Sequence, residues 1–197
     1  DHSDIRGASN DVEFVPATFT PDIAFAVGDR ETILKFNRSA TPAFSVIRYY
    51  YTSDYYDIDF YNSTLGFIVG TYGRIVKWNG TNWNDDLIFL TKNHLRGVKI
   101  LNKTFAFAVG DLGTILKWNG NSWSIYSSPT TNNLTAIDGV NYRCWVFGAG
   151  WSDCYTAAIV GKAGTLLQYA SETQTGSWTV SSSPTTIDLN GIRYYNQ

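Results

Sequence analysis

The chain repeats one phrase four times, and this repeat restricts its possible folds more than any other feature of the sequence. The two clearest copies are "GFIVGTYGRIVKWNGTNW" (residues 66–83) and "AFAVGDLGTILKWNGNSW" (residues 106–123). In each copy an apolar run ends at a Val-Gly pair and a second run begins shortly afterwards, which predicts a β-hairpin. The pairs follow one another at spacings of 42, 40 and 51 residues, in the range of a four-stranded propeller blade. They are Val27-Gly28, Val69-Gly70, Val109-Gly110 and Val160-Gly161.

Two more strands complete each unit. A strand downstream of the hairpin ends at Trp83, Trp123 or Trp178, after an Asn-Gly turn in the middle two copies. A strand upstream of the hairpin carries two apolar residues three positions apart, so each unit contains strands A, B, C and D in chain order. The upstream pairs are Val12/Val15, Phe44/Ile47, Leu95/Val98 and Leu134/Ile137.

A single four-stranded unit cannot bury both of its faces, so the units must stack on one another. Four-stranded units packed around an axis are the blades of a β-propeller. We therefore predict an all-β fold, a β-propeller of about four four-stranded blades plus a spare fifth strand A at the C-terminus. A β-sandwich or a solenoid with accidental internal similarity is the alternative. The expected organisation is an N-terminal arm (1–11), four repeats (about 12–43, 44–94, 95–133 and 134–188) and the additional strand (189–197).

The phrase "VGDLGTILKWNGNSW" resembles the repeat of the photosystem II stability/assembly-factor-like propellers, which are related to the bacterial neuraminidase (BNR, or Asp-box) repeats. The segments "NGTNW" (79–83) and "NGNSW" (119–123) resemble shortened Asp boxes. The resemblance extends from about Val12 to Trp178. It implies the propeller fold but not a function, because propellers carry many unrelated activities. We do not transfer the photosynthetic role of the family to this chain.

The spare strand at the C-terminus, "LNGIRYYNQ", has the pattern of strand A, and Leu189, Ile192 and Tyr194 are its candidate contact residues. Three explanations are open. The chain is part of a larger propeller, or this strand closes a four-bladed ring beside N-terminal residues. Alternatively, the strand adds to an open sheet edge of another molecule.

Several features predict a secreted or cell-surface protein. The chain contains no methionine, even at position 1, which predicts that a secretory signal ahead of Asp1 has been removed. Cys144 and Cys154 flank the Gly-containing apex of an expected hairpin and should form a disulfide; two buried free thiols are the alternative. A net charge of -2 excludes an electrostatic surface for nucleic acid. No run approaches the roughly 18 apolar residues of a membrane span, so we also expect no membrane insertion.

Five Asn-x-Ser/Thr sequons are candidate glycosylation sites. In a meander the A–B and C–D turns lie at one end of the sheet, and four of the sequons fall on such turns. The alternative is that asparagine is simply a common turn residue. The sequons are Asn37 and Asn79 at C–D turns, Asn62 and Asn102 at A–B turns, and Asn133 at the opposite end.

No catalytic residue, cofactor or metal site is expected. The two histidines, His2 and His94, have no nucleophile or ligand partner nearby in sequence, and no motif of a known catalytic class is present. The Asp-box resemblance raises glycoside hydrolysis, which would need clustered arginines. Arg48 and Arg193 recur just after an expected strand A, but Arg96 falls at a different phase and Asp138 takes the equivalent place in repeat 4.

The B–C turns should surround one mouth of the propeller, where a ligand would bind. Two longer segments also distinguish the repeats. The tyrosine-rich stretch Tyr49–Tyr61 is interpreted as an insertion between strands A and B of repeat 2, either an extended blade edge or a contact surface. The cysteine hairpin of repeat 4 carries Trp145 and Trp151. The candidate ligand residues of the B–C turns are Asp29, Arg30, Tyr72, Arg74, Asp111 and Lys162.

Together these features predict a non-catalytic structural, assembly or binding module whose partners are copies of itself, other extracellular proteins or glycans. A carbohydrate-binding lectin or an Asp-box-type glycoside hydrolase is the alternative function.

Overall fold

The computed structural model describes residues 11–16, 23–48, 53–85, 89–171 and 174–194. The strands of these residues form four antiparallel sheets of four strands each, with no α-helix among them. We call the sheets blades 1 to 4 in chain order. None of the described segments forms a helix with the length and apolarity that a membrane crossing requires. The chain divides into two compact units, residues 1–96 and 97–197, which we describe separately.

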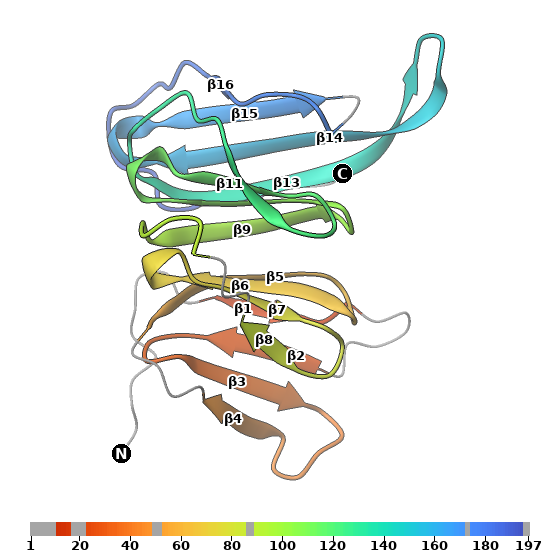
Figure 1. Ribbon diagram of the computed structural model, residues 1–197, viewed down its shortest axis with the longest axis vertical. Helices are drawn as coiled ribbons and strands as arrows, with labels where there is room; N and C mark the ends of the chain where they lie inside the picture. The colour runs from red at the N-terminus through yellow and green to blue at the C-terminus, as the bar shows by residue number, and fades with distance from the viewer. Residues whose placement is uncertain (1–10, 17–22, 49–52, 86–88, 172–173, 195–197) are drawn as a thin grey trace. The chain divides into compact units, whose positions relative to one another are not determined.

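Blades 1 and 2 form the first unit (Figure 1). Strands within each blade follow chain order, as expected for a meander. Phe25 and Ile33 of blade 1 and Ile58 and Trp83 of blade 2 are buried together in one core, so the two sheets pack face to face. The strands are β1 (Val12–Phe14), β2 (Ile23–Val27), β3 (Thr32–Asn37) and β4 (Phe44–Arg48) in blade 1, and β5 (Tyr55–Asn62), β6 (Leu65–Gly70), β7 (Ile75–Trp78) and β8 (Trp83–Asp85) in blade 2.

Blades 3 and 4 form the second unit in the same way, and the division between the units falls within β9. Phe105 and Phe107 of blade 3 pack against Tyr169 of blade 4, and Phe107 also contacts Trp178. The strands are β9 (Leu95–Asn102), β10 (Phe105–Gly110), β11 (Ile115–Trp118) and β12 (Trp123–Tyr126) in blade 3, and β13 (Leu134–Val146), β14 (Gly150–Gly161), β15 (Leu166–Ser171) and β16 (Thr179–Val180) in blade 4.

Paired tryptophans stabilise the C–D hairpins of blades 2 and 3. Trp78 pairs with Trp83 across β7 and β8, with ring centroids 5.2 Å apart, and Trp118 pairs with Trp123 in the same register. Gly80 has a φ of 96° in the turn between them, a conformation that favours glycine. The Asn-Gly signal in the sequence therefore corresponds to a tight turn that aligns two large aromatic side chains.

The expected start of repeat 2 is wrong. Phe44 and Ile47 lie in β4, which pairs with β3 as the last strand of blade 1, so this sheet extends to Arg48 rather than residue 43. The stretch read as a tyrosine-rich insertion contains β5, which is strand A of blade 2 itself. Its first residues, 49–52, lie outside the described part of the chain.

The physical reason for this error is that blade 1 has phenylalanine where the other blades have tryptophan. Phe44 pairs with Phe36 across β3 and β4 as Trp83 pairs with Trp78. Without the tryptophan, the spacing of Phe44 and Ile47 predicts the apolar pair of a strand A instead of a strand D. The residues that hold the corresponding positions are Tyr55 and Ile58, both buried and also three positions apart.

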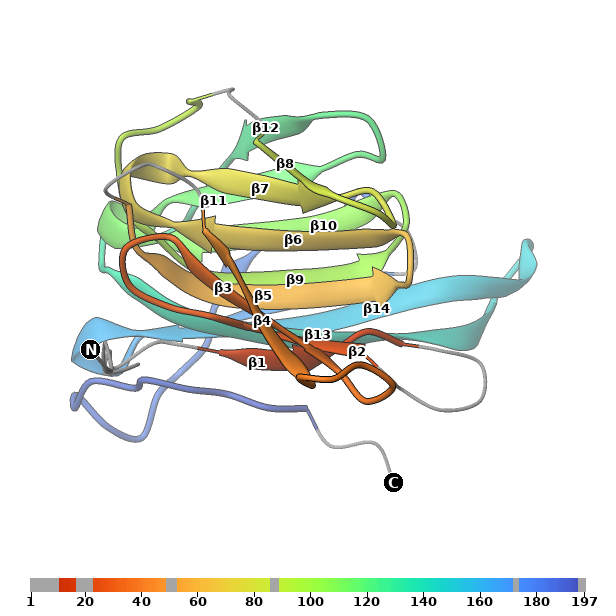
Figure 2. The same ribbon diagram turned by 90° about the horizontal axis from the view of Figure 1, so that it is seen from below.

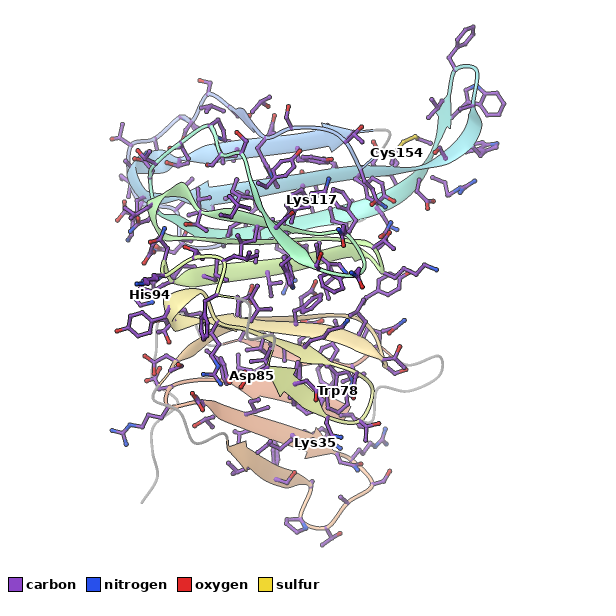
Figure 3. All side chains as sticks on the ribbon, viewed as in Figure 1. Lys35, Trp78, Asp85, His94, Lys117 and Cys154 are labelled. Carbon is purple, nitrogen blue, oxygen red and sulfur yellow. A yellow bond between two sulfur atoms is a disulfide. The ribbon has the colours of Figure 1, made fainter. Side chains whose placement is uncertain are left out.

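The predicted cysteine hairpin is confirmed. Cys144 on β13 and Cys154 on β14 form a disulfide with their Cα atoms 5.9 Å apart. The hairpin continues well beyond the rest of blade 4, and the disulfide lies where it leaves the sheet (Figures 1 and 3).

The segment 189–194 follows blade 4 and runs beside β13 (Figure 2). No strand is assigned to these six residues. The Leu189 N–H donates to the Gly161 carbonyl at 3.0 Å, and Tyr55 N–H donates to Gly28 in the same manner at 3.1 Å. Leu189 therefore has the same position relative to blade 4 that Tyr55, the first residue of the strand A of blade 2, has relative to blade 1. The arm at residues 1–10 and the last three residues lie outside the described part of the chain.

Candidate functional site: the B–C turns

The four B–C turns share one backbone conformation. In each, the glycine of the Val-Gly pair donates its N–H to the carbonyl four residues later, at 2.9–3.1 Å. The residue two positions after that glycine has a φ of 54°, in the left-handed region, although none of the four is glycine. A side chain in this conformation costs about 1 kcal/mol, so the surroundings must stabilise it. These residues are Arg30, Tyr72, Leu112 and Ala163.

That stabilisation comes from a side chain immediately before the next strand A. Each left-handed residue donates its backbone N–H to this side chain. The side chains have different chemistry, but each provides a hydrogen-bond acceptor at the same place. We call these four hydrogen bonds the turn tethers. They are Arg30 to Asp54 Oδ1 (3.0 Å), Tyr72 to His94 Nδ1 (3.2 Å), Leu112 to Asn133 Oδ1 (2.9 Å) and Ala163 to Asp188 Oδ1 (2.9 Å).

Blade 1 departs from this pattern at Glu31. The other turns have glycine there (Gly73, Gly113 and Gly164), with φ between 67° and 73°, whereas Glu31 adopts a φ of 58°. Its side chain is fully buried and pairs with Arg74 of blade 2, Oε1 to Nη1 at 3.3 Å.

Arg74 is also a departure, because the equivalent residues of the other turns are threonines. Arg74 Nη2 binds Asp85 Oδ2 at 2.8 Å. Asp85 itself stands at a strand position that is occupied by an apolar residue in blade 3 (Ile125) and in blade 4 (Val180). Three charged substitutions in the repeat therefore meet in one cluster inside the first unit, the Glu31–Arg74–Asp85 cluster.

Burial and mutual proximity change the pKa values in this cluster. Burial raises the pKa of the Tyr55 hydroxyl well above its ordinary value, although the charge of Arg74 opposes this. Burial by itself lowers the pKa of Arg74, but the neighbouring Tyr55, Asp85 and Glu31 raise it overall. Arg74 therefore remains a permanent cation. The cluster joins blade 1 to blade 2 and has no exposed reactive group that would indicate chemistry.

The six candidate ligand residues have different environments. Asp29 and Asp111 are partly exposed in their turns, whereas Arg30 and Tyr72 are exposed. Arg74 is directed inward and belongs to the cluster described above. Lys162 is half exposed and its Nζ binds Asp188 Oδ2 at 2.9 Å.

A surface of aromatic and basic side chains surrounds the second tether. The Tyr72 ring lies 5.2 Å from the His94 ring, and Tyr56 contacts His94 edge-on at 6.2 Å. The Arg96 guanidinium lies over the Tyr56 ring at 4.6 Å, a cation–π contact. The sequence offers His94 no obvious Cys or Ser partner; in the structure its Nδ1 accepts a hydrogen bond from the Tyr72 N–H, and its ring contacts the rings of Tyr72 and Tyr56.

Arg48 and Asp138, the residues compared for glycoside hydrolysis, do not occupy equivalent strand positions. Arg48 ends β4 and is not next to a strand A, which corrects the expected placement. Asp138 is buried and binds Lys99 Nζ at 3.1 Å and the Tyr194 N–H at 2.6 Å. Among the described residues, no group of three or more His, Cys, Asp or Glu side chains could hold a metal ion.

Sequence reasoning missed the tether residues, although a signal was present. Each stands directly before the first apolar residue of a strand A: Asp54 before Tyr55, His94 before Leu95, Asn133 before Leu134 and Asp188 before Leu189. It also missed Glu31, which alignment of the four turns "GDRET", "GTYGR", "GDLGT" and "GKAGT" would have marked as the one exception.

No protein-family model and no curated protein matches the chain. Solved propeller structures do. YCF48 from Cyanidioschyzon merolae is 13% identical over 93% of this chain and 59% of its own length, with a TM-score of 0.61. YCF48 bound to D1 peptide is 14% identical over 89% of this chain and 71% of its own, with a TM-score of 0.50. The RRP9 WD40 repeats are 12% identical over 86% of this chain and 53% of their own, with a TM-score of 0.60.

These similarities establish the fold class: the chain consists of β-propeller blades. They confirm the expected resemblance at the level of the fold, where YCF48 is among the similar structures. The chain spans only a little over half the length of YCF48 from Cyanidioschyzon merolae and of the RRP9 repeats.

Proposed function

We propose that this protein is a non-catalytic, extracellular assembly module that binds other copies of itself blade to blade. The observation that carries the proposal is the apolar outer face of blade 1. Of the ten positions that strand register assigns to this face, Thr32 and Arg48 at one end are polar and the other eight are apolar. The eight apolar residues are Val12, Phe14, Ala24, Ala26, Leu34, Phe36, Phe44 and Val46.

The same face of blade 2 is buried. Ile68, Val76, Trp78 and Trp83 lie in the core that blade 2 shares with blade 1. On blade 1, by contrast, Val12 is 61% exposed and Phe44 is 63% exposed. An apolar face of this kind marks a binding surface. In the first unit, the equivalent face of blade 2 packs against the inner face of blade 1. A blade of the same repeat should therefore fit the outer face of blade 1.

The other end of the chain offers the complementary feature. The segment 189–194 holds the position of the next strand A on blade 4, through Leu189 and through the Ala163–Asp188 tether. A second copy that places its blade 1 against this segment would continue the blade-on-blade packing. Such a contact is heterologous, so it builds a ring or an open chain of copies.

Propellers of this fold can bind polypeptides, since one similar structure is that of YCF48 with a D1 peptide. This similarity supports protein binding as the general function, and the apolar face of blade 1 supports a second copy as the particular partner.

Analytical ultracentrifugation over a wide concentration range tests self-association. We expect the mass to rise with concentration, and we expect the F14S/F44S variant to remain monomeric because it places two hydroxyls on the apolar face. The L112S variant, which removes an exposed apolar side chain from a B–C turn, should associate like the parent. A parent chain that stays monomeric at every concentration contradicts the proposal.

An extracellular location is supported by the disulfide and by the placement of the sequons. Asn79 is exposed in its turn, whereas Asn102 donates its Nδ2 to the Tyr155 hydroxyl and is partly buried. After secretion from a eukaryotic host, we expect intact-mass spectrometry to show a glycan that N79Q removes and N102Q does not. An unmodified mass for the secreted parent chain contradicts this prediction.

A further inference from the structure

The β13–β14 hairpin extends beyond its own blade. The pairing of β14 with β15 ends at Tyr155 and Ser171, whereas β13 and β14 remain paired with each other to Val146 and Gly150. Figure 1 shows this extension projecting beyond the other strands of blade 4. The part of the hairpin beyond the disulfide therefore forms no strand pairs with β15.

The end of the hairpin is apolar and exposed. The eight residues 145–152, "WVFGAGWS", contain no charged side chain; we call them the hairpin tip. Phe147 is 100% exposed, Trp145 is 65% exposed and Trp151 is 64% exposed. The two tryptophans are directly paired across the strands, with ring centroids 6.0 Å apart. Three large aromatic side chains thus project from a narrow support into water.

The backbone of the hairpin tip is largely satisfied within the hairpin. Trp145 pairs with Trp151 and Val146 with Gly150, and the Ala149 N–H closes the turn on the Val146 carbonyl at 3.1 Å. This is a requirement for entering an apolar medium, where unpaired backbone groups are costly.

The nearest charges behind the hairpin tip neutralise each other. Arg143 Nη1 binds Asp153 Oδ1 at 3.1 Å, and Arg143 Nη2 also donates to the Trp151 carbonyl at 3.0 Å. The Cys144–Cys154 disulfide lies beside this pair. A rigid, uncharged end followed at once by a charged boundary is the pattern of an element that enters an apolar layer to a limited depth.

We propose that the hairpin tip docks in the interfacial layer of a lipid bilayer and anchors the propeller to a membrane surface. A protein pocket is the competing partner, but the hairpin tip has no charged group and only the indole N–H groups of Trp145 and Trp151 and the hydroxyl of Ser152 as polar side-chain groups with which to specify one. The lipid interface requires no directional partner and favours tryptophan and phenylalanine. The sequence predicted no membrane insertion from the absence of a long apolar run, and interfacial docking does not use such a run.

Tryptophan fluorescence reports on this docking directly. The other five tryptophans of the chain, at positions 78, 83, 118, 123 and 178, are at most 6% exposed. A blue shift in emission, or protection from a water-soluble quencher, therefore reports on Trp145 and Trp151. Phosphatidylcholine vesicles are the probe, with a second set containing phosphatidylserine. The protein is kept dilute enough to be monomeric by ultracentrifugation, so that self-association is excluded.

We expect sedimentation with vesicles, a blue shift, and quenching by lipids brominated in the acyl chain. Binding should be similar for both lipid compositions, because the charges beside the hairpin tip are paired. The W145S/F147S/W151S variant should lower the vesicle-bound fraction at least about tenfold, since it removes the aromatic contacts. The L112S/I125S variant, which changes exposed apolar residues elsewhere, should bind like the parent.

Three results would overturn the proposal. The first is no sedimentation and no spectral change at high lipid concentration. The second is vesicle binding that the triple variant retains, which would place the contact elsewhere. The third is a blue shift that depends on protein concentration without lipid, which would show that the hairpin tip docks on a second copy instead.

Discussion

Replacing Arg74 with methionine will lower the free energy of unfolding of the first unit by about 3–5 kcal/mol. The reason is the Glu31–Arg74–Asp85 cluster, in which Arg74 is the only cation. Its loss removes the ion pair that Arg74 forms with the fully buried carboxylate of Glu31, and it also removes the ion pair with Asp85, which has the same charge as Glu31. Urea denaturation of the parent and the R74M variant, followed by tryptophan fluorescence, measures the difference.

The matched control returns the cluster to the residues of the other turns. In E31G/R74T, glycine removes both the buried carboxylate and the cost of a left-handed glutamate, which is about 1 kcal/mol. This double variant should therefore be more stable than R74M. If R74M unfolds at the same urea concentration as the parent, the ion pairs contribute nothing and the account of the cluster is wrong.

Replacing Trp83 with alanine will destabilise the same unit by about 3–5 kcal/mol, the usual cost of truncating a large buried aromatic residue. Trp83 is 3% exposed and contacts Phe25 of blade 1 and both Phe60 and Trp78 of blade 2. The alanine variant leaves a cavity at the contact between the two blades. Thermal and urea denaturation both measure this loss.

The equivalent position in blade 1 provides a matched control for the Trp83 substitution. Phe44 holds the equivalent position in blade 1, but it is 63% exposed. The F44A variant should change the free energy of unfolding by less than about 0.5 kcal/mol when the protein is dilute. Equal effects at the two positions would mean that packing between the blades does not determine the cost.

Most of the fold could be predicted because the same sequence motifs occur in four successive repeats. The Val-Gly pairs, Asn-Gly turns and tryptophans each correspond to a feature that one blade forms by itself. Strand A of blade 2 could not be assigned in this way, because Phe44–Ile47 and Tyr55–Ile58 have the same apolar spacing. Only pairing with β3 or with β6 distinguishes them, and pairing is a property of the folded chain.

The candidate site shows the same limit. Arg74 is a candidate ligand residue in the sequence because it lies in a B–C turn, and these turns should surround the mouth where a ligand would bind. Its actual role depends on Glu31 and Asp85, which are 43 and 11 positions away in the sequence. By contrast, the apolar character of the hairpin tip and the cysteines behind it could be recognised from the sequence alone, because a hairpin brings together residues that are close along the chain.

The turn tethers make the B–C turn of each blade depend on a residue that comes later in the chain. Each of the four B–C turns adopts a left-handed conformation at a non-glycine residue, and each is held by a residue that arrives later in the chain. During synthesis a blade therefore completes its own turn only when the first residues of its successor have emerged from the ribosome. In blade 4, Asp188 accepts the hydrogen bond from the Ala163 N–H, although no strand is assigned to residues 189–194. Asp188 therefore holds the B–C turn of blade 4 in the same way as Asp54, His94 and Asn133 hold the turns of blades 1 to 3.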